Sequence, residues 1–121
     1  MKIAVCSQER SPQAAVDSRF GRSSFFAVYD DKADQWTFIE NAQNLQAAQG
    51  AGIQAAQYII DVEADALLAC NVGPKAVSAL QANSIQIYMV TQGLTVGQAV
   101  QEYLNSSLKP MTEPNVEGHW V

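Results

Sequence analysis

Three arginines gather in one stretch of the chain, directly after its first apolar segment. Arg10, Arg19 and Arg22 lie in this stretch, although the whole sequence has only 7 basic residues against 12 acidic ones. A fourth basic residue, Lys75, follows another apolar segment at residues 66–70. Ligands of parallel α/β sheets bind beyond the carboxyl ends of the strands, and clustered cations attract anions. The pattern therefore predicts an anion site, with surface ion pairs of these arginines to Glu9 and Asp17 as the alternative.

Glycines stand where two helices are expected to begin. Gly50 and Gly52 open one helical pattern, and Gly73 with Pro74 opens another. Free backbone N–H groups at helix starts bind phosphate, sulfate or carboxylate, and glycine lets a ligand approach the backbone. The spacing matches neither a P-loop nor the G-x-G-x-x-G fingerprint, so no nucleotide is specified. Close packing between helix and sheet is the alternative explanation.

The two cysteines each end an apolar segment. If the segments that carry Cys6 and Cys70 are parallel neighbouring strands, both sulfurs lie at the same sheet edge, beside Arg22 and Gly73. Thiolates near arginines and helix N-termini have a lowered pKa and bind soft metals. Inert burial is the alternative, because free cysteine is among the most buried residue types. His119, the only histidine, is either a further metal ligand or a solvated side chain.

Several kinds of catalytic site are not specified by the sequence. The only histidine belongs to the C-terminal tail, so no Ser-His-Asp set can be proposed beyond it, and neither H-E-x-x-H nor C-x-x-C occurs. A two-metal nuclease needs clustered carboxylates, but the first predicted strand carries none. We therefore expect a binding protein and not an enzyme.

Charge and hydrophobicity exclude other classes of protein. The net charge of −5 and the isoelectric point near 4.6 argue against a globally basic nucleic-acid binder and a polybasic membrane adaptor. No apolar run approaches the ~20 residues of a transmembrane helix, and the N-terminal apolar stretch is too short for a signal peptide. We expect a cytoplasmic protein with reduced thiols and with no nucleic-acid or membrane partner.

Apolar patterns predict a mixed α/β domain over residues 1–109, followed by an irregular tail over residues 110–121. Strand–helix–strand units favour parallel pairing, and an acidic turn between the second and third strands predicts an antiparallel hairpin. A mixed five-stranded sheet covered by three helices accounts for every element. The predicted strands are 3–6, 25–29, 36–39, 66–70 and 85–90, and the predicted helices begin near residues 53, 74 and 96.

Two of the predicted helices have distinctive sequence signals. Thr95 and Gln98 match a capping box at the start of the third helix. In the first helix, Ile53, Ala56 and Ile60 recur at helical spacing and predict its buried face.

Short motifs along the chain occur in an order and spacing that are more specific than any one of them. The motifs are M-K-I-A-V at 1–5, D-S-R-F-G-R-S-S-F-F at 17–26, E-N at 40–41, G-A-G at 50–52, N-V-G-P-K-A at 71–76, L-T-V-G-Q-A at 94–99 and G-H-W at 118–120. Together they resemble the dinitrogenase iron–molybdenum cofactor biosynthesis family, the NifX-type domain that is also found at the end of NifB proteins. The most specific stretch, residues 17–26, is similar to the family's F-G-R block.

The resemblance implies a ribonuclease-H-like three-layer α/β fold with strand order 3-2-1-4-5. It also implies a non-enzymatic carrier of an anionic metal–sulfur cluster or its precursor, of the iron–molybdenum or the molybdenum–copper sulfide (orange-protein) type, with a donor or recipient protein. Arginines and helix N-termini can hold such a cluster by charge-assisted hydrogen bonds. The predicted cofactor-binding residues are Arg19, Phe20, Gly21, Arg22, Gly50, Gly52, Asn71, Gly73 and Lys75, and the candidate metal ligands are Cys6, Cys70 and His119.

Two other functions stay open on the sequence. One is an interaction or regulatory domain whose anion site receives a carboxylate or phosphate of a partner. The other is a hydrolase of phosphate esters or nucleic acid, suggested only by analogy of fold. Many family members have histidine where this chain has Arg19, and glycine where it has Asn71, which favours a stand-alone role.

Overall fold

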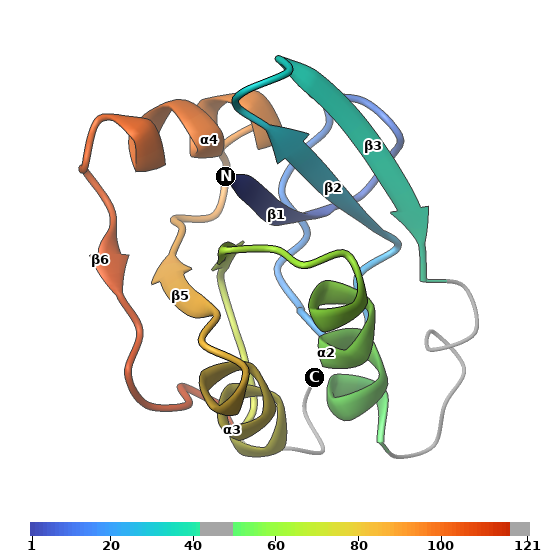
Figure 1. Cartoon of the computed structure of the whole chain (residues 1–121), viewed down its shortest axis with the longest axis vertical. Coiled ribbons are helices and arrows are strands. Elements are labelled where there is room, and N and C mark those ends of the chain that lie inside the picture. Colours follow the sequence, from blue (N-terminus) through green and yellow to red (C-terminus); the bar gives the residue numbers. More distant parts are fainter. Residues whose placement is uncertain (42–49, 117–121) are drawn as a thin grey trace.

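The structure is a computed structural model that describes residues 1–41 and 50–116. An antiparallel hairpin follows the first strand, and helices then alternate with strands, as Figure 1 shows. The elements are β1 (Lys2–Ser7), β2 (Phe25–Asp30), β3 (Gln35–Glu40), α2 (Ala51–Asp61), β4 (Ala66–Ala69), α3 (Pro74–Ala82), β5 (Gln86–Met89), α4 (Val96–Leu104) and β6 (Lys109–Pro110).

The strands of the described chain form one open sheet in the order β3-β2-β1-β4-β5-β6. β1 is parallel to β4, and β4 to β5, whereas β2 is antiparallel to both β1 and β3. The predicted hairpin, the mixed sheet and the order of the first five strands are therefore confirmed. The sheet has one strand more than predicted, because β6 pairs antiparallel with β5 where the irregular tail was expected to begin.

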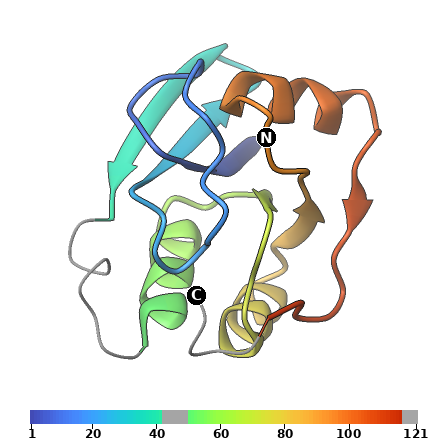
Figure 2. The same cartoon turned by 180° about the vertical axis from the view of Figure 1, so that it is seen from behind.

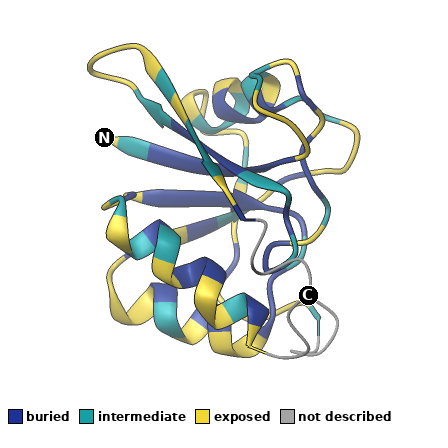
Figure 3. Cartoon of the chain, turned by 90° about the vertical axis from the view of Figure 1, so that its right-hand side faces the viewer, coloured by how far each residue is buried: buried dark blue, intermediate teal, exposed yellow. Residues whose placement is uncertain are grey.

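The sheet separates two hydrophobic clusters. α2 and α3 cover one face of the sheet, and α4 covers the other (Figure 3). Successive residues of β1 point to opposite sides, so Ala4 and Cys6 belong to the cluster under α2 and α3, whereas Ile3 and Val5 belong to the cluster under α4. β1 and β4 are buried on both faces, as is typical of central strands in a sheet covered on both sides.

The predicted capping box at the start of α4 is confirmed. The Gln98 N–H donates to Thr95 Oγ1 at 3.2 Å, and the Thr95 N–H donates to Gln98 Oε1 at 2.9 Å. The two bonds satisfy backbone donors that a helix start otherwise leaves unpaired.

The buried face of α2 agrees only in part with the predicted one. Ala56 is fully buried and Ile60 packs against the core, as predicted, but Ile53 is 46% exposed and Ala55 is fully buried instead. Small residues form the contact because α2 packs against α3 as well as the sheet. A Cβ atom added to Gly52 would lie 3.6 Å from the Cβ of Ala76 in α3, so the helices approach closely at this point.

The chain after β6 runs back along α3 and remains tied to the domain. Met111 is buried, and its N–H donates to the Ile87 oxygen at 2.7 Å. The Gln81 amide donates to the Thr112 oxygen at 3.0 Å. Among the described residues, every helix is too short or too polar to cross a lipid bilayer.

Candidate functional site

The long loop that follows β1 folds back over the carboxyl edge of the sheet. It pairs in turn with three segments, through isolated bridges that join Val16 to Ser7, Ala15 to Thr95 and Arg19 to Asn71. Figure 2 shows this loop in blue, running between α4 and the start of α2. The loop therefore connects the ends of β1 and β4 with the starts of the helices, which is the region where the sequence predicts an anion site.

Arg19 is held at this edge by its backbone pairing with the segment after β4. The N–H of Phe20 donates to the Asn71 oxygen at 3.2 Å. The Asn71 side-chain amide donates to the Ser18 oxygen at 2.6 Å. These two hydrogen bonds fix the residues on both sides of Arg19. Lys75 lies in the first turn of α3, a few residues beyond Asn71.

Asp17 braces the same loop from within. It is only 8% exposed. Its Oδ1 accepts the Arg19 N–H at 3.1 Å, and its Oδ2 accepts the Ser24 N–H at 3.3 Å. Its own N–H donates to the Cys6 oxygen at 3.1 Å. The carboxylate thus orients the backbone of the loop at both ends of the F-G-R motif.

Gly21 packs directly on the first turn of α2. A Cβ atom added to Gly21 would lie 2.9 Å from the Gly52 nitrogen, closer than real contacts allow. The side-chain amide of the fully buried Asn41 donates to the oxygens of Gly21 at 3.1 Å and Ser23 at 2.8 Å. The E-N and G-A-G motifs therefore support the F-G-R loop. Gly50, the N-cap of α2, has a φ of 80° and makes no side-chain capping bond.

The start of α3 contributes a second helix N-terminus to this edge. Its N-cap Gly73 is buried and has extended backbone with no side-chain capping bond, and Pro74 follows at the first helical position. Proline has no N–H to donate there and is preorganised for the first helical turn.

The basic residues of the loop have different environments. Arg10 donates to Glu40 Oε2 at 3.4 Å and lies over the Phe25 ring at 5.1 Å, so it is in a surface ion pair, although with Glu40 and not with Glu9 or Asp17. Arg22 is partly buried. Arg19 and Lys75 are exposed, and within residues 1–41 and 50–116 neither is in an ion pair. Arg19 and Lys75 can therefore attract an external anion.

Acidic residues gather at the opposite, amino-terminal edge of the sheet. The Met1 ammonium pairs with Asp31 Oδ1 at 2.9 Å, and the Lys2 N–H donates to Asp65 Oδ2 at 2.8 Å. These contacts lie at the start of β1, remote from its carboxyl end. Negative charge is therefore concentrated at the amino-terminal edge of the sheet, opposite the edge at which Arg19 and Lys75 lie. The acidic residues of the amino-terminal edge are Asp30, Asp31, Asp34, Asp61, Glu63 and Asp65.

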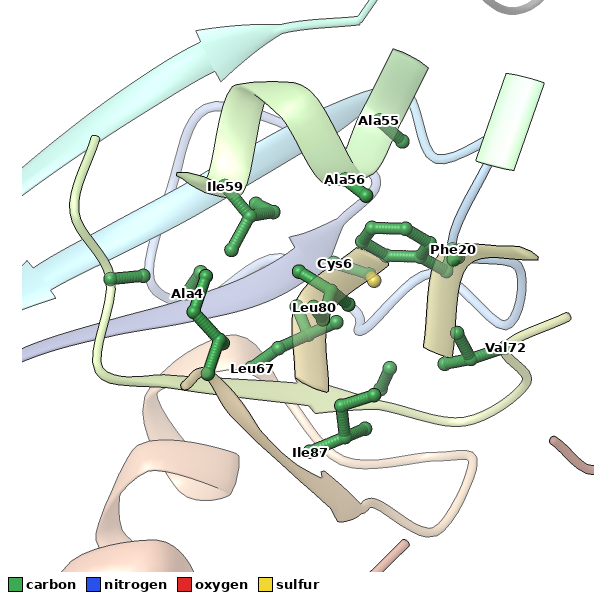
Figure 4. Packing of buried hydrophobic residues seen from close by; sticks show 14 of the residues in the cluster. Ala4, Cys6, Phe20, Ala55, Ala56, Ile59, Leu67, Val72, Leu80 and Ile87 are labelled. Carbon is green, nitrogen blue, oxygen red and sulfur yellow. The ribbon is translucent and has the colours of Figure 1, made fainter. Parts of the chain in front are cut away.

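The two cysteines do not converge as predicted. β1 and β4 are parallel neighbours, but their register aligns Val5 with Leu68. Cys6 consequently points into the cluster under α2 and α3, and Cys70 into the cluster under α4. Figure 4 shows the Cys6 sulfur among buried core side chains. Within the described part of the chain, no three histidine, cysteine or carboxylate side chains are placed to hold a metal ion.

The thiol pKa values shift opposite to the predicted direction. Burial raises the pKa of Cys6 well above its usual value, and the charges of Asp17 and Cys70 raise it further. Burial, followed by Asp17, also raises the pKa of Cys70. Both residues are therefore neutral thiols at pH 7. The pKa of each thiol is set by desolvation and by the nearby Asp17 carboxylate, and not by an arginine as predicted.

Phe20, another predicted site residue, does not lie where it was expected. The Phe20 side chain is fully buried, with its ring centroid 5.4 Å from that of Phe26, so it supports the loop from the core and does not face the edge (Figure 4). His119 lies outside the described residues.

One residue at this edge was missed by sequence reasoning. Asn115, from the segment after β6, donates through Nδ2 to the Cys70 oxygen at 2.8 Å and accepts the Val72 N–H at 2.9 Å. Its only local signal is a position after proline in a polar stretch, which is typical of a turn.

Three hollows in the surface lie away from this edge. Their volumes are, in the order given next, about 550, 350 and 500 Å³, and no predicted site residue lines them. They lie between α3 and β6, between α2 and the β2–β3 hairpin, and between α4 and the loop at Pro12. The candidate site is therefore distinct from these three hollows.

The sequence matches a known family over most of its length. The family described as dinitrogenase iron-molybdenum cofactor matches residues 1–106. The apo form of the orange protein from Desulfovibrio gigas has a similar structure, with 38% identity, a TM-score of 0.92 and coverage of 95% of this chain and 96% of that one. A candidate NifB protein of the DUF35 family from Thermotoga has 27% identity and a TM-score of 0.83, over 97% and 98% of the chains. A comparison with curated proteins finds no match.

Proposed function

Because this chain belongs to the dinitrogenase iron–molybdenum cofactor family, we propose that it binds and carries an anionic metal–sulfur cluster as cargo. The cargo is a cluster or precursor of the iron–molybdenum sulfide or molybdenum–copper sulfide class. The protein acts without catalysis, in the cytoplasm, and passes the cluster between a donor and a recipient protein. The binding site is the carboxyl edge of β1 and β4.

The observation that supports this proposal most is that the backbone of Arg19 is fixed at the carboxyl edge of the sheet. Its backbone is fixed by pairing with Asn71 and by the buried carboxylate of Asp17, while the residue itself is exposed. An ordered cation loses less conformational freedom on binding than a mobile one. Guanidinium N–H groups form charge-assisted hydrogen bonds with anionic acceptors. Arg19 is thus preorganised to receive a negatively charged cluster.

Neighbouring groups add to the attraction of an anion at this edge. α2 and α3 both begin here, at Gly50 and Gly73, and neither start has a side-chain cap. The positive end of each helix dipole favours negative charge. Lys75 adds a full positive charge in the first turn of α3. Six acidic residues lie at the other end of the sheet, where they oppose anion binding least. At this edge, Glu40 is paired with Arg10, and the buried Asp17 carboxylate accepts backbone N–H groups.

Direct metal ligation is assigned to fewer residues than the sequence suggests. We retain Cys70, which is buried but keeps 8% of its surface exposed, and His119 as candidate ligands. Cys6 has no exposed surface and points away from Cys70, so we do not retain it. Single Cys70→Ser and His119→Ala variants test these assignments, because a ligand's loss changes the charge-transfer spectrum of the bound cluster.

Anaerobic reconstitution tests the function. The apo protein is mixed with tetrathiomolybdate and Cu(I), or with Fe(II), molybdate and sulfide, and then separated from free reagents. We expect stoichiometric metal and sulfide with charge-transfer absorbance. Arg19→Gln should weaken retention about tenfold, as for a lost charge-assisted hydrogen bond.

Lys32→Gln is the matched control, because it removes the same charge from the exposed hairpin at the opposite edge. Equal retention by wild type, Arg19→Gln and Lys32→Gln would place the cluster elsewhere. A wild-type protein that takes up neither reagent mixture, yet isolates a specific partner protein, would favour the interaction domain instead.

A further inference from the structure

The side chain of Asn115 takes the place of a strand neighbour for the segment after β4. Its Nδ2 donates to the Cys70 oxygen at 2.8 Å and approaches Asn71 Oδ1 at 3.4 Å. Its Oδ1 accepts the Val72 N–H at 2.9 Å, and its own backbone N–H donates to the Val72 oxygen at 3.3 Å. One residue thereby satisfies donors and acceptors on both sides of Asn71.

Asn71 is also the residue that fixes the arginine loop on its other side. Its oxygen accepts the Phe20 N–H at 3.2 Å, and its side-chain amide donates to the Ser18 oxygen at 2.6 Å. The segment at residues 70–72 therefore lies between two partners, the loop that carries Arg19 and the segment that carries Asn115. A shift of Asn71 on one side must alter the bonds on the other.

We propose that Asn115 is a positioning residue for the candidate anion site. Asn115 does not contact the cargo. It fixes the position of Asn71, and Asn71 in turn orders the backbone around Arg19. The proposal rests on the function proposed above and adds a residue to it. Asn115 lies beyond residues 1–106, to which the family match extends, so this assignment concerns the chain's own C-terminal segment.

Hydrogen exchange in the apo protein tests the coupling independently of any cluster. In Asn115→Ala, the Val72 amide loses its acceptor and should exchange faster, on the order of tenfold for one lost hydrogen bond. The decisive probe is the Phe20 amide, which is bonded to Asn71 and not to Asn115. It should also exchange several-fold faster. A purely local anchor would leave the Phe20 amide unchanged, and that result would overturn the proposal.

Asn83→Ala is the matched control. Asn83 is an exposed asparagine whose amide donates to the Ala79 oxygen at 2.8 Å at the end of α3. This variant should leave the exchange of Val72 and Phe20 unchanged. If Asn115→Ala does not fold, Asn115→Asp keeps the acceptor for Val72 and loses the Nδ2 donor to the Cys70 oxygen and to Asn71 Oδ1. The Phe20 amide should again exchange faster, and unchanged exchange there would overturn the proposal.

Retention of the tetrathiomolybdate–copper reagent separates this proposal from the proposed function. Asn115→Ala should retain it several-fold less tightly than Asn83→Ala. Wild-type uptake with equal retention by Asn115→Ala would overturn the positioning role and leave the carrier function standing. Faster Phe20 exchange without any wild-type uptake would support the coupling and overturn the carrier function.

A chain ending at Val116 keeps Asn115 and should retain wild-type exchange at Phe20, which excludes an effect of the later residues.

Discussion

Gly21 and Gly52 meet backbone to backbone where the arginine loop touches the first turn of α2. A Cβ atom on Gly21 would lie 2.9 Å from the Gly52 nitrogen and 3.0 Å from its Cα. The neighbouring atoms belong to the backbone of a helix and cannot turn away as a flexible side chain would. The contact fixes the distance between the F-G-R loop and the start of α2, on which the candidate site depends.

Gly21→Ala should destabilise the protein because its methyl group would displace helix backbone. We expect a loss of about 1–3 kcal/mol in the free energy of unfolding, the usual cost of overpacking. Urea denaturation followed by circular dichroism measures it.

Gly52→Ala is the matched control within the same contact. Its Cβ would meet only Ala76 Cβ, at an ordinary 3.6 Å. Alanine is favoured over glycine inside a helix by roughly 0.5–1 kcal/mol, so the variant should be as stable as wild type or slightly more stable. Equal destabilisation by both variants would contradict the close contact assigned to Gly21.

Asp17→Ala should loosen the arginine loop. The change leaves the Arg19 and Ser24 N–H groups without their acceptor, and an unmet buried donor costs roughly 1–3 kcal/mol. Unfolding experiments should show this loss. Amide exchange in the folded protein should rise at Arg19 and Ser24 before it rises in β1. Unchanged exchange at these two amides would show that the Asp17 carboxylate does not hold them in place as their hydrogen-bond acceptor.

The buried thiol of Cys6 makes the stability fall at alkaline pH. Its folded-state pKa is raised by burial, whereas the unfolded thiol ionises near pH ~8.5. The unfolded state therefore releases a proton that the folded state keeps. Stability is complete below the unfolded pKa and declines above it, by at most ~1.4 kcal/mol per pH unit for one thiol.

Urea titrations between about pH 8 and pH 10 should show this decline in the free energy of unfolding of the wild-type protein. The decline should be smaller in Cys6→Ala. An identical pH dependence in both proteins would assign the effect to other groups.

Thr95→Ala should separate stability from anion binding. The variant loses the Thr95 oxygen that accepts the Gln98 N–H, and a lost N-cap costs about 1 kcal/mol. Differential scanning calorimetry should show the lower melting temperature. Cluster retention should match wild type, because the pairing of Thr95 with Ala15 in the arginine loop uses backbone atoms, which the variant keeps. A parallel loss of retention would mean that global stability governs binding.

Local patterns were sufficient to predict the three described helices, the first five strands and the antiparallel hairpin. Short apolar runs, the acidic turn and the Thr95–Gln98 box each act within a few residues, so they can be recognised without knowledge of the fold. The parallel pairing of β1 with β4, and with it the shared edge for Arg19 and Asn71, was expected only from the strand order that the family resemblance implies. In α2, the prediction failed at Ile53 because isoleucine spacing does not reveal close helix–helix contact.

The sequence by itself therefore determined the elements, their order and the edge at which the basic residues gather. Only the tertiary structure decided which way each side chain at that edge points. One residue of register separates the two faces of a strand, and so Cys6 and Cys70 lie in different clusters. The bonds of Asn115 to Cys70 and Val72 span more than 40 positions. Contacts over such distances leave no periodic signal, because they depend on how the folded chain returns to its own sheet.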